Sequence, residues 1–81
     1  MLYDEMTLRE LEMLVFIYQK PRNVQELSDF LNVAVAAVNI YTHRLRKRGY
    51  IETDRSQKEV IHALSDKGRN IIIKLRADVA R

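Results

Sequence analysis

The sequence has no cysteine and no tryptophan, and it holds only one proline and two glycines among its 81 residues. Without cysteine the chain cannot form a disulfide framework, a thiolate metal site or a cysteine nucleophile, and a reducing compartment is its simplest location. The longest apolar runs, over 13–18 and 33–38, have six residues each, whereas a membrane span needs about 20. The N-terminus carries acidic residues before any basic one, unlike a signal peptide, so we expect a cytoplasmic protein.

The length and composition are those of one small folded domain. We expect residues 1–81 to form a single unit, because a domain usually takes about 100 to 200 residues. Apolar residues make up 47% of the chain and charged residues 31%, which is typical of a compact, helix-rich protein. A chain this short buries only about 60 to 65% of its unfolded surface, so a partner subunit would add stability.

The charge is distributed unevenly along the chain. The net charge is +3, which by itself says little about partners. Residues 1–43 hold three basic and six acidic residues, whereas 44–81 hold eleven basic and five acidic ones. The steepest part is 44–48, with four fixed positive charges in five residues. One face of the molecule is therefore expected to be positive.

Two capping signals predict where the first helices begin. Thr7 followed by Glu10 has the form of a capping box, and Pro21 ends the pattern, so we predict a helix over about 7–19. Asn23 followed by Glu26 predicts a short second helix ending near residue 31. In the first helix the three- and four-residue spacing predicts one buried stripe: Leu11, Leu14, Val15 and Tyr18.

A third helix follows directly after a tight turn. Asn32 tolerates the left-handed conformation that ends a helix, and the next helix is predicted from about Val35 to Arg48, with Gly49 available as its C-terminal cap. Ala34, which precedes it, offers no side-chain acceptor for a cap. The inward side is predicted to hold Val38, Tyr41, Thr42 and Leu45.

The remaining chain reads as a hairpin and a last helix. Beyond Gly49 the apolar period drops to two, which predicts a hairpin over about 50–64 with its turn at 54–57. The turn lacks Asn-Gly or Asp-Gly, so the register stays open by a residue or two. Ser65 and Asp66 begin a last helix over about 66–80, with its apolar line at Ile72, Leu75 and Val79.

The predicted fold is mostly α with a β-hairpin, in the order α-α-α-β-β-α of a winged helix-turn-helix. The helix-turn-helix would span about 24–48 and the wing about 50–64. A major groove of DNA is about 12 Å wide and accepts one α-helix. To enter it, the third helix must protrude from the surface of the domain with one side exposed. Its outward side carries the groove candidates: Ala36, Asn39, Ile40, His43 and Lys47.

Four segments carry a family resemblance. Residues 24–33, 36–39 and 45–51 resemble the helix-turn-helix of MarR-type winged-helix transcriptional regulators, and 63–69 is similar to the segment where their second wing strand enters the next helix. The resemblance implies contacts to double-stranded DNA. Base contacts fall on Ala36, Asn39, Ile40 and His43; phosphate contacts on Val24, Gln25, Arg44, Arg46, Lys47 and Arg48; wing contacts on Arg55, Ser56, Gln57 and Lys58.

The flanking segments predict a homodimer. The first and last helices are apolar on more than one face, and a small domain that exposed them singly would tend to aggregate. A two-fold axis would set two recognition helices about 34 Å apart on a palindromic site. The long flanking helices of full-length MarR-type proteins are missing or truncated in this sequence, so we expect no small-molecule effector. The expected dimer interface is Leu2, Tyr3, Met6, Ile71, Ile72, Leu75 and Val79.

Two other classes of binding function stay open, and catalysis is not expected. The chain could be a winged-helix protein-interaction subunit, or a DNA-binding protein of architectural or replicative use. The two histidines fall on different elements, no Ser-His-Asp grouping or Gly-rich phosphate loop is present, and we assign His62 no role. We expect no catalytic residue, no metal and no cofactor. The main hypothesis is a sequence-specific, homodimeric transcriptional regulator.

Overall fold

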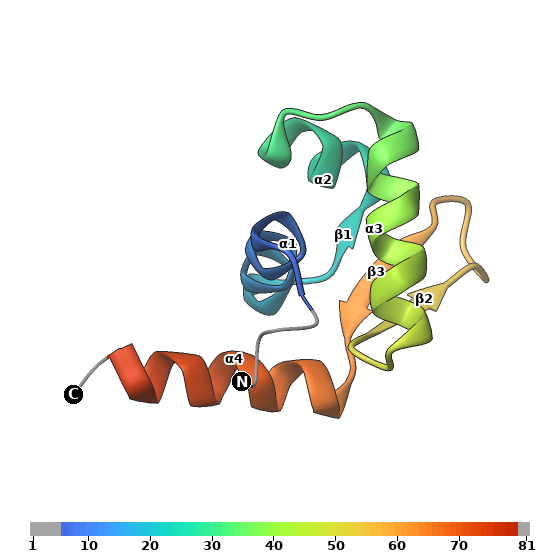
Figure 1. Ribbon diagram of the computed structural model, residues 1–81. Helices are drawn as coiled ribbons and strands as arrows, with labels where there is room; N and C mark the ends of the chain where they lie inside the picture. The colour runs from blue at the N-terminus through green and yellow to red at the C-terminus, as the bar shows by residue number, and fades with distance from the viewer. Residues whose placement is uncertain (1–5, 80–81) are drawn as a thin grey trace.

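The structure, a computed structural model, describes residues 6–79, which form four helices and a three-stranded antiparallel sheet. In Figure 1, α2 lies above α1, α3 stands to the right beside the sheet, and α4 runs along the bottom. The mostly helical fold with a hairpin is as predicted. The elements in chain order are α1 (Leu8–Gln19), β1 (Arg22–Asn23), α2 (Val24–Leu31), α3 (Val35–Lys47), β2 (Ile51–Asp54), β3 (Ile61–Leu64) and α4 (Asp66–Val79).

Both predicted capping boxes are present. At α1 the Glu10 amide donates to the Thr7 hydroxyl at 3.1 Å, and the Thr7 amide donates to the Glu10 carboxylate at 2.9 Å. At α2 the corresponding bonds between Glu26 and Asn23 are 2.8 and 3.0 Å. Each box satisfies two amides that would otherwise lack partners, which explains why the helices begin where the sequence predicted.

The turn between α2 and α3 also has the predicted form. Asn32 is left-handed, with φ 56° and ψ 49°, and its amide donates to the Ser28 carbonyl. Ala34 makes no side-chain cap, and Val35 begins α3 as expected. The helix ends at Lys47, one residue before the predicted end, and Gly49 follows with φ 83°.

The sheet contains one strand that the sequence did not predict. The two residues of β1 pair with β3, which pairs in turn with β2, so the strand order is β1-β3-β2. The predicted order α-α-α-β-β-α therefore needs a short strand inserted before α2. The hairpin is also shorter than expected, since its loop occupies 55–60 and β3 begins only at Ile61.

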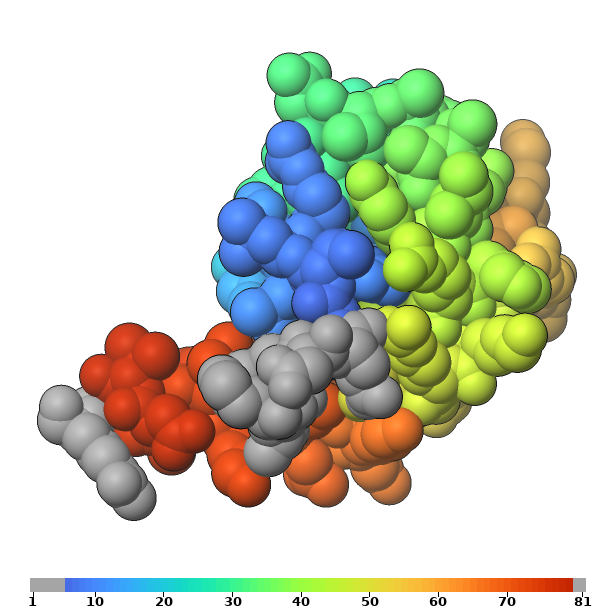
Figure 2. All heavy atoms as spheres, in the orientation of Figure 1, coloured from blue at the N-terminus to red at the C-terminus, as the bar shows by residue number. Residues whose placement is uncertain are grey.

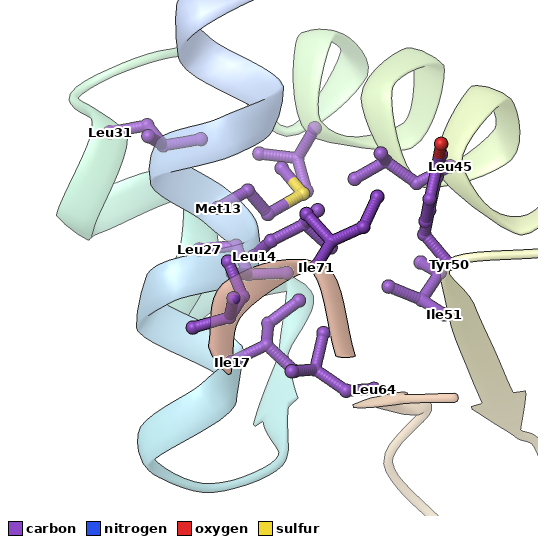
Figure 3. Packing of buried hydrophobic residues seen from close by; sticks show 12 residues of the cluster. Met13, Leu14, Ile17, Leu27, Leu31, Leu45, Tyr50, Ile51, Leu64 and Ile71 are labelled. Atoms are coloured by element: carbon purple, nitrogen blue, oxygen red, sulfur yellow. The ribbon is translucent and has the colours of Figure 1, made fainter. Parts of the chain in front are cut away.

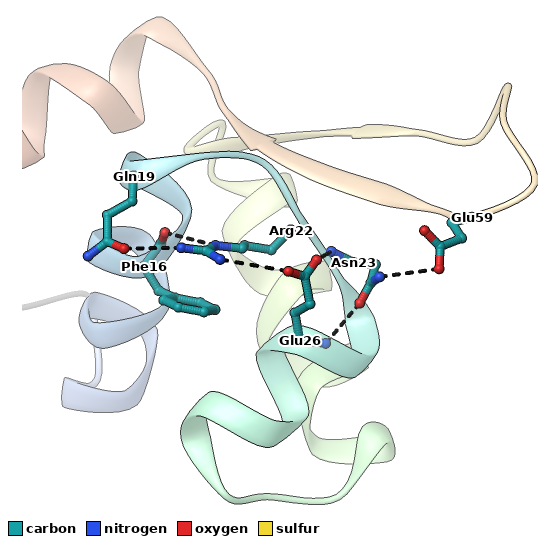
Figure 4. Close-up of polar contacts among 6 residues, drawn as sticks. All are labelled: Phe16, Gln19, Arg22, Asn23, Glu26 and Glu59. Atoms are coloured by element: carbon teal, nitrogen blue, oxygen red, sulfur yellow. Dashed lines mark hydrogen bonds and ion pairs between the residues drawn. The ribbon is translucent and has the colours of Figure 1, made fainter.

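Arg22 explains why β1 is held in place. Its guanidinium, on a residue only 9% exposed, donates to the Phe16 carbonyl at 3.3 Å and to the Gln19 amide oxygen at 3.1 Å. The same group lies 3.7 Å from the Glu26 carboxylate and stacks on the Phe16 ring. Figure 4 shows this network joining the end of α1 to the start of α2.

The core lies where the four helices and the sheet meet. Figure 3 shows side chains from α1, α2, α3 and the hairpin converging on one cluster. Gly68 allows α4 to pass close to the hairpin, because a Cβ atom at this position would overlap the Tyr50 carbonyl. The cluster consists of Met13, Leu14, Ile17, Leu27, Leu31, Val38, Leu45, Tyr50, Ile51, Leu64, Ile71 and Ile72.

In two helices the buried face matches the predicted one only in part. In α1 the fully buried positions are Glu10, Met13, Leu14 and Ile17, whereas Val15 is 41% exposed. Of the stripe predicted for α1, Leu14 is buried and Leu11 and Tyr18 pack partly buried against the core, whereas Val15 is exposed. In α4 the buried positions are Gly68, Ile71 and Ile72, and Val79 is 77% exposed. Both helices carry apolar residues on several faces, so spacing alone did not identify the buried one.

Candidate nucleic-acid interface

The third helix presents a polar side to solvent. Val38 and Leu45 are fully buried and Thr42 is 2% exposed, so α3 is held by a seam along one side. In Figure 2 the atoms of α3, coloured green to yellow, lie uncovered along the right-hand part of the molecule. The five groove candidates are all exposed: Ala36, Asn39, Ile40, His43 and Lys47.

A cleft of about 430 Å³ lies between α3 and the wing, which comprises β2, β3 and the loop 55–60. Two arginines, Arg46 from α3 and Arg55 from the wing loop, contribute positive charge to it. Such a concave surface with cations on both sides can accept an anionic chain. The residues that line the cleft are Val24, Asn39, Thr42, His43, Arg46, Arg55, Val60 and His62.

The Thr53 hydroxyl and the His62 ring form a series of hydrogen bonds with Arg46. The guanidinium of Arg46 donates to the Thr53 hydroxyl at 3.1 Å, and the same hydroxyl lies 3.0 Å from Nδ1 of His62. His62 is only 4% exposed. Burial lowers the pKa of His62, and the charges of Arg46 and Arg55 lower this pKa further, so the ring is neutral at pH 7.

The basic run of α3 does not form a single face. Successive helical residues point about 100° apart. Arg44 turns toward α1, where its Nε atom lies 3.9 Å from the Glu10 carboxylate. Arg46 is directed to the wing and Lys47 is exposed, while Arg48 caps the helix and its carbonyl accepts from Lys67 at 2.8 Å. Of these four predicted phosphate contacts, Arg46 is the one that lines the cleft.

The start of α2 is less positive than expected. Val24 lines the cleft, and Gln25 is exposed with its side chain donating to Asp29. Two carboxylates lie beside this helix end, because Glu26 accepts from the Asn23 amide and Glu59 accepts from the Asn23 side chain at 3.3 Å. They reduce the attraction of the helix end for a phosphate.

The wing residues lie at the tip of the hairpin. Arg55, Ser56, Gln57 and Lys58 are all exposed. The Asp54 carboxylate accepts from the Ser56 hydroxyl at 2.6 Å and from the Ser56 amide at 2.8 Å, and these bonds lower its pKa. This turn orders the base of the loop that carries the exposed Arg55 and Lys58.

Part of the predicted dimer interface is buried within one chain. Ile71 and Ile72 are 8% and 1% exposed, so they belong to the core and are not available to a partner. Met6 packs against the core, Leu75 is half-buried and Val79 is exposed, while Leu2 and Tyr3 lie outside the described residues. Of the three consecutive isoleucines, Ile73 faces solvent and is 48% exposed.

A second groove, of about 460 Å³, lies between α1 and α4. Arg76 crosses it, donating to the Tyr18 hydroxyl at 3.3 Å with its guanidinium over the ring. Val15, 41% exposed, adds apolar surface beside it. Figure 1 shows α4 continuing past α1 and away from the body. The groove is lined by Val15, Tyr18, Gln19, Ile72, Leu75 and Arg76.

Sequence reasoning missed Thr53 and His62 as parts of the site. Their strands place them directly opposite one another, and that pairing depends on a hairpin register that the sequence left open. Arg46 following a buried Leu45 was a visible signal that one cation of the run would turn toward the wing.

Among residues 6–79, no three His, Asp or Glu side chains gather as a metal ion would require. No helix in this part of the chain combines the length and the apolar character needed to cross a membrane.

Comparison with known proteins identifies the fold. No protein-family model and no curated protein matches the chain. Solved structures do match. RV1404 of Mycobacterium tuberculosis aligns with a TM-score of 0.85 and 26% identity, over 99% of this chain and 60% of that one. The transcriptional regulator Tm0710 of Thermotoga maritima aligns with a TM-score of 0.80 and 28% identity, over 88% and 53%.

A third match names the architecture. Mb0332 of Mycobacterium bovis, a homodimeric winged helix-turn-helix DNA-binding domain, aligns with a TM-score of 0.77 and 18% identity, over 91% of this chain and 68% of that one. The chain spans about 60% of the length of RV1404 and about half that of Tm0710. The predicted fold is confirmed: the chain is a winged helix-turn-helix domain, similar in structure to those of transcriptional regulators.

Proposed function

We propose that the chain is a sequence-specific double-stranded DNA-binding protein that inserts α3 into a major groove. The observation that carries the proposal is the cleft between α3 and the wing, because Arg46 and Arg55 flank a concave surface beside exposed polar residues. A duplex presents phosphates on either side of each groove, so it matches cations that flank a protruding helix.

Each residue type has a defined part in this proposal. Asn39 and His43, one turn apart and both exposed, would read base edges, and the Asn amide suits adenine in a bidentate manner. Ala36 and Ile40 would contact thymine methyl groups. Arg46, Lys47 and the wing residues Arg55 and Lys58 would hold phosphates, with Arg44 and Arg48 in supporting positions.

We propose that two copies bind together. The groove between α1 and α4 and the exposed Ile73 and Val79 offer an apolar surface outside the DNA-binding side. Mb0332, which shares the fold, is a homodimer. Two recognition helices related by a two-fold axis would read half-sites about 34 Å apart. Leu75, half-buried on α4, would join this interface.

The proposed biological role is a small transcriptional regulator of MarR-like type. Tm0710 is a transcriptional regulator of the same fold at 28% identity, which supports the regulatory role. The MarR-like assignment rests on the sequence motifs of residues 24–33, 36–39, 45–51 and 63–69. In this proposal the protein acts by binding, without catalysis, cofactor or small-molecule effector.

A titration of the full chain on random and selected duplexes, at 50 and 200 mM salt, tests the proposal. If about six to ten phosphates are contacted, the affinity should fall by a factor on the order of 10³ to 10⁵ between the two salt concentrations. The selected duplex should bind more tightly than the random one at both. No binding at 50 mM salt would contradict the proposal and favour a protein-interaction subunit.

A further inference from the structure

Thr53 and His62 face each other across the two strands of the wing. They are directly paired in the register of β2 and β3, and the Thr53 hydroxyl lies 3.0 Å from Nδ1 of His62. Thr53 is half-buried and His62 nearly fully buried. His62 lines the cleft that Arg46 and Arg55 flank, and Thr53 lies between His62 and Arg46, within hydrogen-bond distance of both.

The direction of the hydrogen bonds follows from the groups involved. A guanidinium can only donate, so the Thr53 oxygen accepts from Arg46. The Thr53 hydroxyl proton is then free to point to Nδ1 of His62, which accepts when the ring is neutral and protonated at Nε2. The bonds run in one direction, from Arg46 through Thr53 to His62, and such chains strengthen each member.

The series of hydrogen bonds from Arg46 to His62 restricts where the Arg46 guanidinium can lie. An arginine side chain loses substantial rotamer freedom when it is ordered, so an arginine ordered before binding loses less on contact with DNA. Within residues 6–79, the hydrogen bond to Thr53 uses one of the five N–H donors of Arg46, and the structure gives that guanidinium no second side-chain partner. The other donors remain available to an anion in the cleft.

We propose that Thr53 and His62 are positioning residues that hold the Arg46 guanidinium in the cleft for contact with a DNA phosphate. The inference rests on the proposed function, since it assigns Arg46 to the backbone of a duplex. Thr53 orients Arg46 directly, and His62 orients Thr53 by accepting a hydrogen bond from its hydroxyl group. The pair would thus set the affinity for DNA without touching it.

The first test measures coupling between Thr53 and Arg46 on a selected duplex. Thr53→Val keeps the shape of the side chain and removes the hydroxyl, so it should weaken binding about fivefold, as expected for one net hydrogen bond. Thr53→Ser keeps the hydroxyl and should bind like the original chain. In an Arg46→Ala background, Thr53→Val should have no further effect, because the group it positions is gone.

The second test applies the same logic to His62. His62→Leu removes the acceptor and should weaken binding, whereas His62→Asn places an amide oxygen near the Nδ1 position and should preserve most of the affinity. Thermal unfolding of each variant, monitored by circular dichroism, shows that it is folded at the assay temperature. His62→Leu should likewise have no effect in the Arg46→Ala background.

The outcomes separate this inference from the proposed function. Additive losses in the Thr53→Val, Arg46→Ala double variant, or full affinity of Thr53→Val alone, would overturn the positioning role and leave DNA binding intact. Failure of the unmodified chain to bind any duplex at low salt would overturn both. Coupled losses with rescue by Thr53→Ser would establish the inference.

Discussion

The Nε atom of Arg44 lies 3.9 Å from the Oε2 atom of Glu10, so an arginine of α3 is the ionic partner of a carboxylate that is fully buried on α1. The other carboxylate oxygen, Oε1, accepts from the Thr7 amide in the capping box. Among the described residues, Oε2 has no hydrogen-bond donor. The orientation of α3 relative to α1 therefore depends on an electrostatic contact as well as on packing.

Arg44→Met should destabilise the fold by about 1 to 2 kcal/mol. The change keeps the aliphatic contacts and removes the charge that compensates a buried carboxylate, and losing one partner of a fully buried pair costs about 3 to 5 kcal/mol. The effect is smaller here because the Arg44 side chain is 46% exposed and screened by solvent. Urea unfolding at pH 7 measures the loss.

Two control variants identify the cause of that loss. Arg44→Lys keeps the charge and should lose less stability than Arg44→Met. Glu10→Gln keeps an acceptor for the Thr7 amide and removes the negative charge, so Arg44→Met should cost little in that background. An equal cost in both backgrounds would mean that Arg44 acts only through packing.

His62 predicts a loss of stability as the solution becomes acidic. Burial, followed by the charges of Arg46 and Arg55, lowers the pKa of His62 below 6.5 in the folded state. The unfolded chain therefore takes up the proton first. The stability that the neutral His62 ring contributes is fully present above about pH 6.5. It is lost as the pH falls from there through the pKa of His62 in the folded state.

Urea midpoints at pH 7.5 and 5.0 test this dependence. The unmodified chain should have the lower midpoint at pH 5.0, and His62→Asn should remove most of the difference. The lowered pKa values of Glu26, from the Asn23 amide bond, and of Asp54, from the Ser56 hydroxyl bond, place their effects below pH 4.5. A midpoint that changes equally in both proteins would argue against His62 as the source.

The parts of the fold that sequence predicted correctly are those fixed by neighbouring residues. The capping boxes at Thr7 and Asn23 each join residues three positions apart, and the left-handed Asn32 depends on its own side chain. These features need no tertiary partner, so their residue types are sufficient to locate them. The outward side of α3 was also predictable, because its polar and apolar residues alternate with a clear helical period.

The features that sequence did not predict depend on contacts between distant segments. Ile71, Ile72 and Ile73 are chemically alike, and only the position of α1 and the hairpin decides that the first two are buried. The two residues of β1 are too few to show a strand pattern in the sequence. Arg22 is held in β1 by a network of contacts with α1 and α2. The pairing of Thr53 with His62 required the hairpin register.

Asn39 and Lys47 should differ in the kind of DNA binding that they support. Asn39→Ala should cost about 1 to 3 kcal/mol on a selected duplex and little on a random one, because it removes a base contact. Lys47→Ala should weaken binding to both duplexes alike and reduce the salt slope by about one. Affinities on both duplexes at several salt concentrations distinguish the two effects.

Matching behaviour of these two variants would contradict their assigned roles. The expected difference requires that the exposed Asn39 amide reaches a base edge while Lys47, about two helical turns further along α3, reaches the backbone. Lys74→Ala removes a positive charge from the exposed side of α4 and serves as the control. It should change neither affinity nor sequence preference, because after its first turns α4 runs away from α3 and the wing (Figure 1).

Ile73→Glu should convert the proposed dimer to a monomer. Ile73 is 48% exposed on α4, next to the groove that α4 forms with α1, and a carboxylate there would be buried without a partner in a dimer interface. Ile40→Glu is the matched control, because Ile40 is 58% exposed on α3 and belongs to the proposed DNA-binding side.

Sedimentation at micromolar concentration should give a dimer for the unmodified chain and for Ile40→Glu, and a monomer for Ile73→Glu. The unmodified chain should bind a palindromic duplex more tightly than a duplex with a single half-site, and Ile73→Glu should lose this difference. Ile40→Glu should weaken binding to both duplexes. A monomeric unmodified chain would mean that the apolar side of α4 serves another purpose.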